Sequence, residues 1–234
     1  MRVLGLNIRQ GGGSRVPRLA KALLSRNPDA VVLGEYHANG AGRELARLLE
    51  RGGLIHQARG SDDPSVRGVF LAATTPFSLE SIPEWPDEER HRVLVASFEG
   101  LRLIATYFPA TAPHIAEMFV PLLAATARLR GRPTLLVGDL NAGLNPADTE
   151  GAALSAGARF GETLEAGWID LWRECNPDRR EFTWYSPGAR NGFRLDHALL
   201  LGADPNRVEA CRYDHTIRRD QISDHSLLEV SWSE

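Results

Sequence analysis

Four polar side chains directly follow short apolar segments of the chain. Asn7 follows VLGL, Glu35 follows VVLG, Tyr107 follows LIAT and Asp139 follows LLVG. Apolar segments of this length are typical of buried β-strands, which places each polar group at the carboxyl end of a strand. Asn141 lies two residues beyond Asp139, so the carboxylate and the carboxamide are expected to point the same way. Such positions can present acids and hydrogen-bonding groups together at one edge of a sheet.

Three further groups precede apolar segments instead of following them. Asp196 comes just before ALLL, and Asp224 and His225 come just before SLLEV. Strands that begin with these residues would have to run opposite to the first group for all the polar side chains to meet at one rim. A mixed sheet contains strands of both directions, so the pattern favours one.

Carboxylates that crowd one rim repel one another unless a cation lies among them. Glu35, Asp139, Asp196 and Asp224 are hard oxygen donors, a set that suits Mg²⁺ or Mn²⁺, and these ions also bind the phosphate oxygens of substrates. His225 beside an acid can act as an imidazolium or as a proton carrier. Metal, carboxylate and histidine together indicate hydrolysis of a phosphate ester by an activated water.

Strands and helices must position these groups, and the apolar and turn patterns predict where they lie. Strands are predicted at residues 2–8, 29–34, 54–58, 68–74, 77–82, 92–98, 101–107, 135–137, 181–185, 194–201, 207–213 and 226–232. Helices are predicted at residues 14–26, 42–50, 112–129 and 162–165, with Ser14 as the cap of the first. Gly138 is expected to let the chain leave the sheet. Because helices and strands do not alternate strictly, two mixed sheets packed together are favoured.

Length and composition bound the class of protein. The 234 residues, 43% of them hydrophobic and 24% charged, are expected to form a single domain over 1–234 with a real core. No apolar segment approaches the roughly 20 residues that cross a bilayer, and the amino terminus lacks a signal-peptide pattern. Cys175 and Cys211 have no metal-type spacing. Free thiols and a cytoplasmic location without membrane attachment are therefore expected.

The net charge of −3 gives the chain no general attraction to nucleic acid. A protein of this charge that binds nucleic acid needs a local basic face. Its basic residues are almost all arginines, with Lys21 the single lysine. Arginine binds phosphate well, although an arginine-rich composition also reflects GC-rich coding, and the coding explanation is favoured.

Six short motifs occur in a fixed order along nearly the whole chain: LNI at Asn7, LGE at Glu35, ATYFP at Tyr107, GDLN at Asp139 and Asn141, RLDH at Asp196, and SDH at Asp224 and His225. Together they resemble the endonuclease/exonuclease/phosphatase superfamily, which includes exonuclease III-like nucleases and deoxyribonuclease I. The resemblance implies a DNase I-like α/β fold, a four-layer sandwich in which two packed mixed β-sheets are flanked by helices.

The resemblance also implies a metal site. Glu35 would hold the catalytic Mg²⁺ or Mn²⁺, supported by Asn7 and Asp224. The acids at this rim titrate together, so the sequence assigns no individual proton positions.

The resemblance implies roles for five catalytic residues. Asp139 would orient or deprotonate the attacking water, and Asn141 would bind the phosphate. His225 would contact the scissile phosphate, with Asp196 fixing its tautomer. Tyr107 would donate a hydrogen bond to the phosphate or to the leaving oxygen. Taken singly, each of these residues also fits a structural role in a turn or a core, and it is their joint order that favours catalysis.

The stretch FTWYSPGARNGFRLDH resembles the pocket-forming segment of the same nucleases. Trp184 and Phe193 would form an apolar wall able to stack a base or enclose a sugar, although aromatic residues in strands also serve as core. Arg190 and Asn191 would lie close to phosphate.

Two positions depart from the abasic-site enzymes of the superfamily. Ala110 stands where those enzymes carry an amide side chain after Tyr-x-Pro, and Arg9 stands where they carry an acidic or amide residue. The region after Asn141 also lacks their DNA-binding insertions. These departures predict a reduced DNA-binding surface.

The sequence thus predicts an Mg²⁺-dependent phosphodiester hydrolase with DNA as its substrate and exonuclease III-like chemistry. A phosphatase or phosphodiesterase for a small molecule or a lipid headgroup is the alternative. A catalytically silent binding module is a third reading, against which the complete catalytic set argues. No obligate protein partner is predicted.

Overall fold

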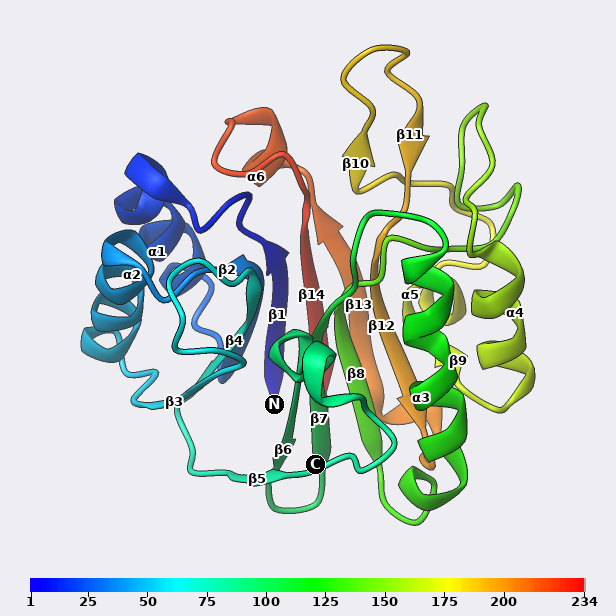
Figure 1. The fold of residues 1–234 in the computed structure, drawn as a ribbon, viewed down its shortest axis with the longest axis horizontal. Helices are drawn as coiled ribbons and strands as arrows, with labels where there is room; N and C mark the ends of the chain where they lie inside the picture. The colour runs from blue at the N-terminus through cyan, green and yellow to red at the C-terminus, as the bar shows by residue number, and fades with distance from the viewer. Residues whose placement is uncertain (234) are drawn as a thin grey trace.

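Two β-sheets packed face to face form the centre of the computed structural model, which describes residues 1–233 (Figure 1). The first sheet has the strand order β13-β14-β1-β2-β4-β3. Its strands are Val208–Asp214 (β13), Leu227–Trp232 (β14), Arg2–Asn7 (β1), Ala30–Tyr36 (β2), Gly68–Ala73 (β4) and His56–Arg59 (β3). β1 and β2 run parallel, and the other neighbours in this sheet are antiparallel.

The second sheet has the strand order β5-β6-β7-β8-β12-β9. Its strands are Ser78–Glu80 (β5), Val93–Ser97 (β6), Arg102–Tyr107 (β7), Thr134–Asp139 (β8), Asp196–Leu201 (β12) and Ile169–Asp170 (β9). Only β7 and β8 run parallel among these described strands. A separate two-stranded hairpin is formed by Trp184–Tyr185 (β10) and Gly192–Phe193 (β11).

Helices cover the outer face of each sheet (Figure 1). Val16–Leu24 (α1) and Gly40–Arg51 (α2) lie on the first sheet, and His114–Leu129 (α3) and Gly157–Glu165 (α4) lie on the second. Two short helices, Leu171–Cys175 (α5) and Thr216–Arg219 (α6), and three 3-10 turns, Gly13–Arg15, Asp87–Arg92 and Pro205–Arg207, complete the elements of the described chain. This order of layers confirms the predicted four-layer α/β sandwich of mixed sheets.

The central strands are apolar on both faces because both faces are covered. Val3 and Val32 point into the core between the sheets, where they join Leu103 and Leu135 of the second sheet. The adjacent residues along the same strands, such as Leu4 next to Val3, point to the helix side instead. Successive strand residues alternate between faces, so each apolar run feeds two cores.

The sequence predicts that the strand before Asp139 ends at Gly138, but the structure differs. β8 continues through Asp139, and Gly138 instead allows a close approach by the neighbouring strand. A Cβ atom at Gly138 would lie 1.8 Å from the backbone oxygen of Thr106 in β7. The glycine is required by this contact and not by a turn.

The beginnings of the first two helices also differ from the predictions. Ser14 lies within a 3-10 turn and does not cap α1, which begins at Val16. α2 begins at Gly40, two residues earlier than predicted, because the Asn39 side chain caps it. The Asn39 Oδ1 atom accepts a hydrogen bond from the Gly42 amide at 3.0 Å.

Other boundaries shifted by a few residues, and the shortest elements were not predicted. The strand predicted at 181–185 is reduced to β10, and α4 begins at Gly157 instead of residue 162. Elements of two to five residues, such as α5, α6 and β9, are too short to show a periodic pattern. None of the helices in residues 1–233 has the length and apolar character needed to cross a bilayer. Cys175 and Cys211 are both free, as predicted.

Candidate active site

Three of the predicted site residues lie side by side across adjacent strands of the second sheet. The register pairs Tyr107 of β7 with Asp139 of β8, and Asp139 with Asp196 of β12. β12 runs opposite to the other two strands, so the start of β12 meets the ends of β7 and β8. This arrangement confirms the expectation that strands of opposite direction bring their polar ends to one rim.

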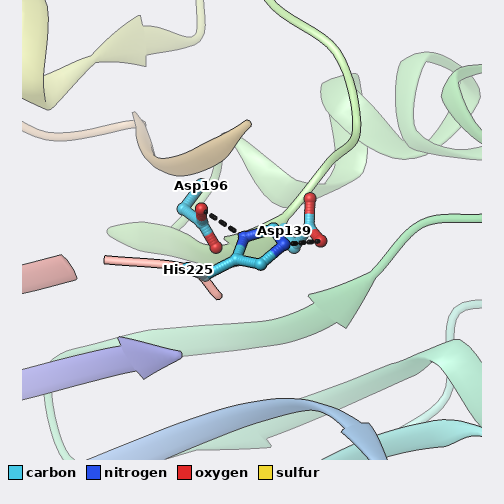
Figure 2. Close-up of side chains that lie close together, drawn as sticks. All are labelled: Asp139, Asp196 and His225. Carbon is cyan, nitrogen blue, oxygen red and sulfur yellow. Dashed lines mark hydrogen bonds and ion pairs between the residues drawn. The ribbon is translucent and has the colours of Figure 1, made fainter. Parts of the chain in front are cut away.

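The His225 imidazole, just before β14, lies between the carboxylates of Asp139 and Asp196 (Figure 2). Its Nδ1 atom is 2.9 Å from Asp196 Oδ2, within hydrogen-bonding distance, and its Nε2 atom is 3.9 Å from Asp139 Oδ2. All three side chains are buried. The first sheet therefore contributes a histidine to a pair of acids on the second sheet.

This burial shifts the proton affinities of two members of the cluster. Burial, together with the charge of Asp196, raises the pKa of Asp139 to about 7, although His225 acts in the opposite direction. Burial by itself lowers the pKa of His225, but the Asp196 and Asp139 carboxylates outweigh burial and raise that pKa to about 10. The imidazole is therefore positively charged at neutral pH, with both ring nitrogens able to donate.

Asn7, at the end of β1, connects this cluster to Glu35. The Asn7 Nδ2 atom donates to Asp139 Oδ2 at 2.9 Å and to Glu35 Oε1 at 3.2 Å. The Asn7 Oδ1 atom accepts from the Arg9 amide at 2.9 Å, which fixes the orientation of the carboxamide. One amide group thus spans the two sheets and holds two acids close to each other.

Glu35 reaches the site because β2 is irregular at this point. The pairing of β2 with β4 shifts register between Leu33 and Tyr36, and Glu35 has a positive φ of 59°. A bulge of this kind turns a side chain away from its regular direction, and the positive φ costs about 1–2 kcal/mol in a residue other than glycine. The Gln10 amide, in the turn after β1, donates to Glu35 Oε2 at 2.7 Å and holds the carboxylate in place.

Tyr107 and Asn141 complete the polar edge. The Tyr107 hydroxyl donates to Glu35 Oε1 at 3.5 Å, and burial together with the Glu35 charge raises the pKa of Tyr107 to about 12. The phenol therefore keeps its proton and remains a donor. The Asn141 amide donates to Asp139 Oδ1 at 2.9 Å, while its side chain donates to the Phe108 oxygen at 3.0 Å.

A cavity of about 400 Å³ opens onto these groups. Its polar wall holds Asn7, Glu35, Asp139, Asn141, Asp224 and His225, and its remaining wall holds Ala110, Ile115, Ala153, Leu154, Ser155, Trp184, Phe193 and Leu195. The indole of Trp184 lies 5.9 Å from the Phe193 ring and 6.4 Å from the His225 ring, measured between centroids. Trp184 and Phe193 therefore form an apolar wall beside the acids, where the sequence placed them.

The structure does not bring Arg190 and Asn191 to this cavity. They lie in the turn of the β10–β11 hairpin, where Arg190 is exposed. The Arg190 amide donates to the Ser186 oxygen, and the Asn191 amide donates to Ser186 Oγ at 3.0 Å. Their contact with phosphate stays a prediction for a substrate that extends beyond the cavity.

Sequence reasoning overlooked three residues that position the site. The Ser223 hydroxyl donates to the Asn7 oxygen at 2.5 Å and accepts from the His225 amide at 3.2 Å. Thr183 Oγ1 accepts from the Leu195 amide at 3.0 Å, just before Asp196. Ser223 belongs to the SDH motif and could have been found there, whereas Thr183 carries no such signal.

The third overlooked residue is Arg67. Its NH1 atom lies 3.8 Å from Glu35 Oε1. No sequence motif contains it, because it belongs to the irregular segment between β3 and β4.

The donor set suits a hard divalent cation. Asp139, Asp196 and His225 each offer one atom within 4.8 Å of the others. The His225 ring already pairs with both acids. Asp139 Oδ2, the atom that faces His225, also accepts from the Asn7 amide, and the same amide donates to Glu35 Oε1. Two carboxylates so close together favour a cation between them.

The Endonuclease/Exonuclease/phosphatase family model matches residues 4–225, and the chain belongs to this family. It is thus classed with enzymes that hydrolyse phosphate esters. The zebrafish (Danio rerio) DNA repair nuclease APEX1 is 28% identical over an alignment of 178 positions, and this alignment covers 62% of this chain and 55% of that protein. The chain therefore matches about half the length of this curated relative.

Two solved structures share the fold over the full length of both chains. The 3′ phosphatase NExo from Neisseria, bound to a product DNA hairpin, has a TM-score of 0.83 at 22% identity. An AP endonuclease from Archaeoglobus fulgidus has a TM-score of 0.86 at 19% identity. These similarities confirm the fold that the sequence motifs implied.

Proposed function

We propose that this protein is a divalent-metal-dependent phosphodiesterase that cleaves DNA, a nuclease of the exonuclease III type. The observation that carries the proposal is the His225 imidazole between Asp139 and Asp196, one amide group away from Glu35, on the wall of a cavity. DNA as the substrate is supported by family membership and by the named activities of APEX1 and of the two structural neighbours.

Each group at the cavity has a task in such a reaction. The Asp139 carboxylate, with a pKa near 7, is suited to orient a water molecule and take its proton at neutral pH. The charged His225 imidazole, oriented by Asp196, stabilises negative charge on a phosphate oxygen. Asn141 can donate to a phosphate oxygen from the cavity wall. Tyr107 keeps its proton and can donate a hydrogen bond from its phenolic O–H at the same edge.

Glu35, Asn7 and Asp224 would hold the divalent cation, and Mg²⁺ or Mn²⁺ suits these oxygen donors. When bound, the cation supplies Lewis-acid polarisation and neutralises phosphate charge. Trp184 and Phe193 would pack against the sugar or base next to the scissile bond.

A phosphatase or phosphodiesterase for a small ester is the second candidate. The observation that favours it is the limited cavity of about 400 Å³ with Ala110 and Ile115 in its wall. Such a cavity encloses a single sugar phosphate and adds no polar contact from Ala110 to a neighbouring phosphate.

A panel of substrates separates the candidates. Supercoiled plasmid, a single-stranded oligonucleotide, a duplex with an abasic site and bis(4-nitrophenyl) phosphate are each incubated with Mg²⁺ or with EDTA. We expect cleavage of at least one DNA substrate, abolished by EDTA and by His225→Ala. His56→Ala, a substitution of a half-buried histidine on β3, serves as the control and should retain activity. Turnover of the aryl ester alone supports the second candidate, and no turnover anywhere contradicts both.

A further inference from the structure

Arg67 lies beside Glu35 at the edge of the site, and neither the motifs nor the mechanism gives it a role. It is the residue before β4, whose first residue, Gly68, pairs with Tyr36 next to Glu35. The bulge that turns Glu35 into the site therefore also brings Arg67 to the same edge. The Arg67 side chain remains 46% exposed, compared with 16% for Glu35.

The Arg67 guanidinium contacts two groups of the site without being enclosed by them. The Tyr107 hydroxyl is a hydrogen-bonding neighbour and the main cause that raises the pKa of Arg67, and the Glu35 carboxylate is the second neighbour. The Arg67 NH1 atom is 3.8 Å from Glu35 Oε1, beyond hydrogen-bonding distance. That oxygen already accepts from the Asn7 amide and the Tyr107 hydroxyl. By comparison, Arg102 and Glu80 on the same protein pair at 2.9 Å. A guanidinium has five N–H donors, so Arg67 can face both Tyr107 and Glu35 and still donate to another acceptor.

Arg67 occupies the position of a counter-charge for a carboxylate that suits a divalent cation. A guanidinium and a cation compete for the same oxygens, because each gains from the same negative charge. If a cation takes the Glu35 carboxylate, Arg67 loses its carboxylate partner, because Glu35 is the acid with which Arg67 pairs among the described residues. A planar guanidinium with free donors matches the oxygens of a phosphate in a two-point contact.

Arg67 is not part of the cavity wall. The half-exposed Arg67 side chain lies at the open edge of the site, beyond Glu35, whereas Asp139 and His225 face the cavity. In a strand whose scissile phosphate lies at Asp139 and His225, the adjacent phosphate is the group that reaches this edge. Such a second phosphate exists in a polynucleotide and is missing from a small ester.

We propose that Arg67 neutralises Glu35 in the metal-free protein and, once a divalent cation takes Glu35, binds the phosphate adjacent to the scissile one. The substrate class that follows is a polynucleotide strand, in preference to an isolated phosphate ester. The second half of this assignment rests on the proposed function, and the first half does not.

The first experiment measures Mn²⁺ binding alone, by calorimetric titration of the full chain without substrate. Removing a competing positive charge should tighten binding, so Arg67→Ala is expected to lower the Kd for Mn²⁺ about 3- to 10-fold, and Arg67→Lys to change it less. Arg47→Ala is the matched control, because Arg47 faces Glu44 on the exposed side of α2 at 3.6 Å. An unchanged or weakened Kd in Arg67→Ala overturns the counter-charge role, since a purely structural residue gives that result.

The second experiment compares two substrates at saturating Mg²⁺. Arg67→Ala should raise KM for a DNA oligonucleotide about 10-fold, with kcat within about 3-fold, and leave KM for bis(4-nitrophenyl) phosphate unchanged. Loss of one phosphate contact should also reduce the slope of log affinity against log salt by about 0.9 for a duplex. An equal rise of KM for both substrates, or no rise for either, overturns the assignment to an adjacent phosphate.

The two experiments separate this assignment from the proposed function. A wild-type protein that hydrolyses no phosphate ester contradicts the proposed function and the phosphate half of the inference. The Mn²⁺ titration needs no turnover, so it still decides whether Arg67 and a cation compete for Glu35.

Discussion

Two clusters of buried charge lie in this protein, and they are built in opposite ways. The arginine cluster consists of Arg194, Arg173, Asp148 and Asp170. Arg194 donates to Asp148 through Nε at 2.7 Å and NH2 at 2.8 Å, and to Asp170 through NH1 at 3.0 Å. Arg173 pairs with Asp148 at 2.8 Å. Two positive charges therefore face two negative ones, in a place where Arg194 and Asp148 have no exposed surface.

The cavity cluster, made of Glu35, Asn7, Asp139, Asp196 and His225, is not balanced in this way. One imidazolium serves two carboxylates, and the third carboxylate, Glu35, lies one amide group away with Arg67 as a half-exposed counter-charge at 3.8 Å. Three acids therefore face two positive groups. This cluster also opens onto a cavity, where solvent and substrate have access.

A structural charge cluster and a functional one differ in how completely their charges pair. Where opposite charges pair completely and are sealed from water, removing one leaves the others uncompensated, and stability depends on the set. Where acids exceed bases beside a cavity, the fold holds the groups in an unfavourable arrangement that a cation and a phosphate can relieve. The two clusters should therefore respond in opposite ways to substitution, pH and metal.

The largest expected effect is on activity. Asp139→Asn should reduce the rate of metal-dependent cleavage by about 10²–10⁴-fold, because the amide cannot accept a proton from water. Its free energy of unfolding should stay within about 1 kcal/mol of the wild-type value, since relief of a buried charge offsets one lost hydrogen bond. Cleavage assays and urea unfolding measure the two quantities. Asp62→Asn, at an exposed position, is the control; a large loss of stability in Asp139→Asn would place Asp139 with the structural residues.

Substitution in the arginine cluster should act on stability instead. Arg194→Met is expected to lower the free energy of unfolding by about 3–5 kcal/mol, because Asp148 and Asp170 lose their buried partner. Urea unfolding measures this change. Arg159→Met, which breaks an exposed pair with Glu162, should cost less than about 1 kcal/mol. Equal effects of the two substitutions would show that the buried cluster contributes no more than a surface ion pair.

The two clusters should also lose stability in opposite directions of pH change, the cavity cluster as the pH rises and the arginine cluster as it falls. The pKa of His225 is raised to about 10 in the folded chain, so its contribution to stability is complete below pH 6.5 and is lost as the pH rises through 10. The pKa of Asp139 is raised to about 7, so its ionisation also lowers stability, between about pH 4 and pH 7. Burial by itself raises the pKa of Asp170, but Arg194 outweighs burial and lowers it. The contribution of Asp170 is therefore present above its unfolded pKa of 3.8 and lost in acid.

Urea unfolding in EDTA between pH 3 and pH 10 measures both dependences. His225→Gln should flatten the alkaline part of the curve, and Arg194→Met should flatten the acid part. If His225→Gln flattens the acid part, or Arg194→Met flattens the alkaline part, the charges assigned to these clusters are wrong.

The smallest expected effect is the stabilisation by metal. At ten times its Kd, Mg²⁺ should raise the free energy of unfolding by about 1.4 kcal/mol, or the Tm by about 3–5 °C. Glu35→Gln should lose this increment, because it removes the carboxylate that suits the cation, whereas Arg194→Met should retain it on a lower baseline. Thermal unfolding with and without Mg²⁺ measures the increment. Retention of the full increment in Glu35→Gln would locate the cation elsewhere.

The sequence predicted the long elements and the central site better than the short elements and the rim. Apolar runs such as the one before Asp139 identify buried strands, because burial on both faces leaves a continuous signal. α5 and β9 have too few residues to show one, and Gly138 was misread because its neighbour Thr106 is distant in sequence. At the rim, the structure places Arg190 in a hairpin turn outside the cavity, so its contact with phosphate stays a prediction. Arg67 carries no sequence signal, because its place beside Glu35 arises from a neighbouring strand.

The sequence by itself determined which residues form the central strands, which polar groups stand at their ends, and to which family the motifs point. Only the tertiary structure decided that His225 of one sheet lies between Asp139 and Asp196 of the other, and that Arg67 faces Glu35. The reason is physical. Strand formation depends on local side-chain patterns. The protonation state of a side chain, and the groups it contacts, depend instead on burial and on neighbours that sheet packing brings from distant parts of the chain.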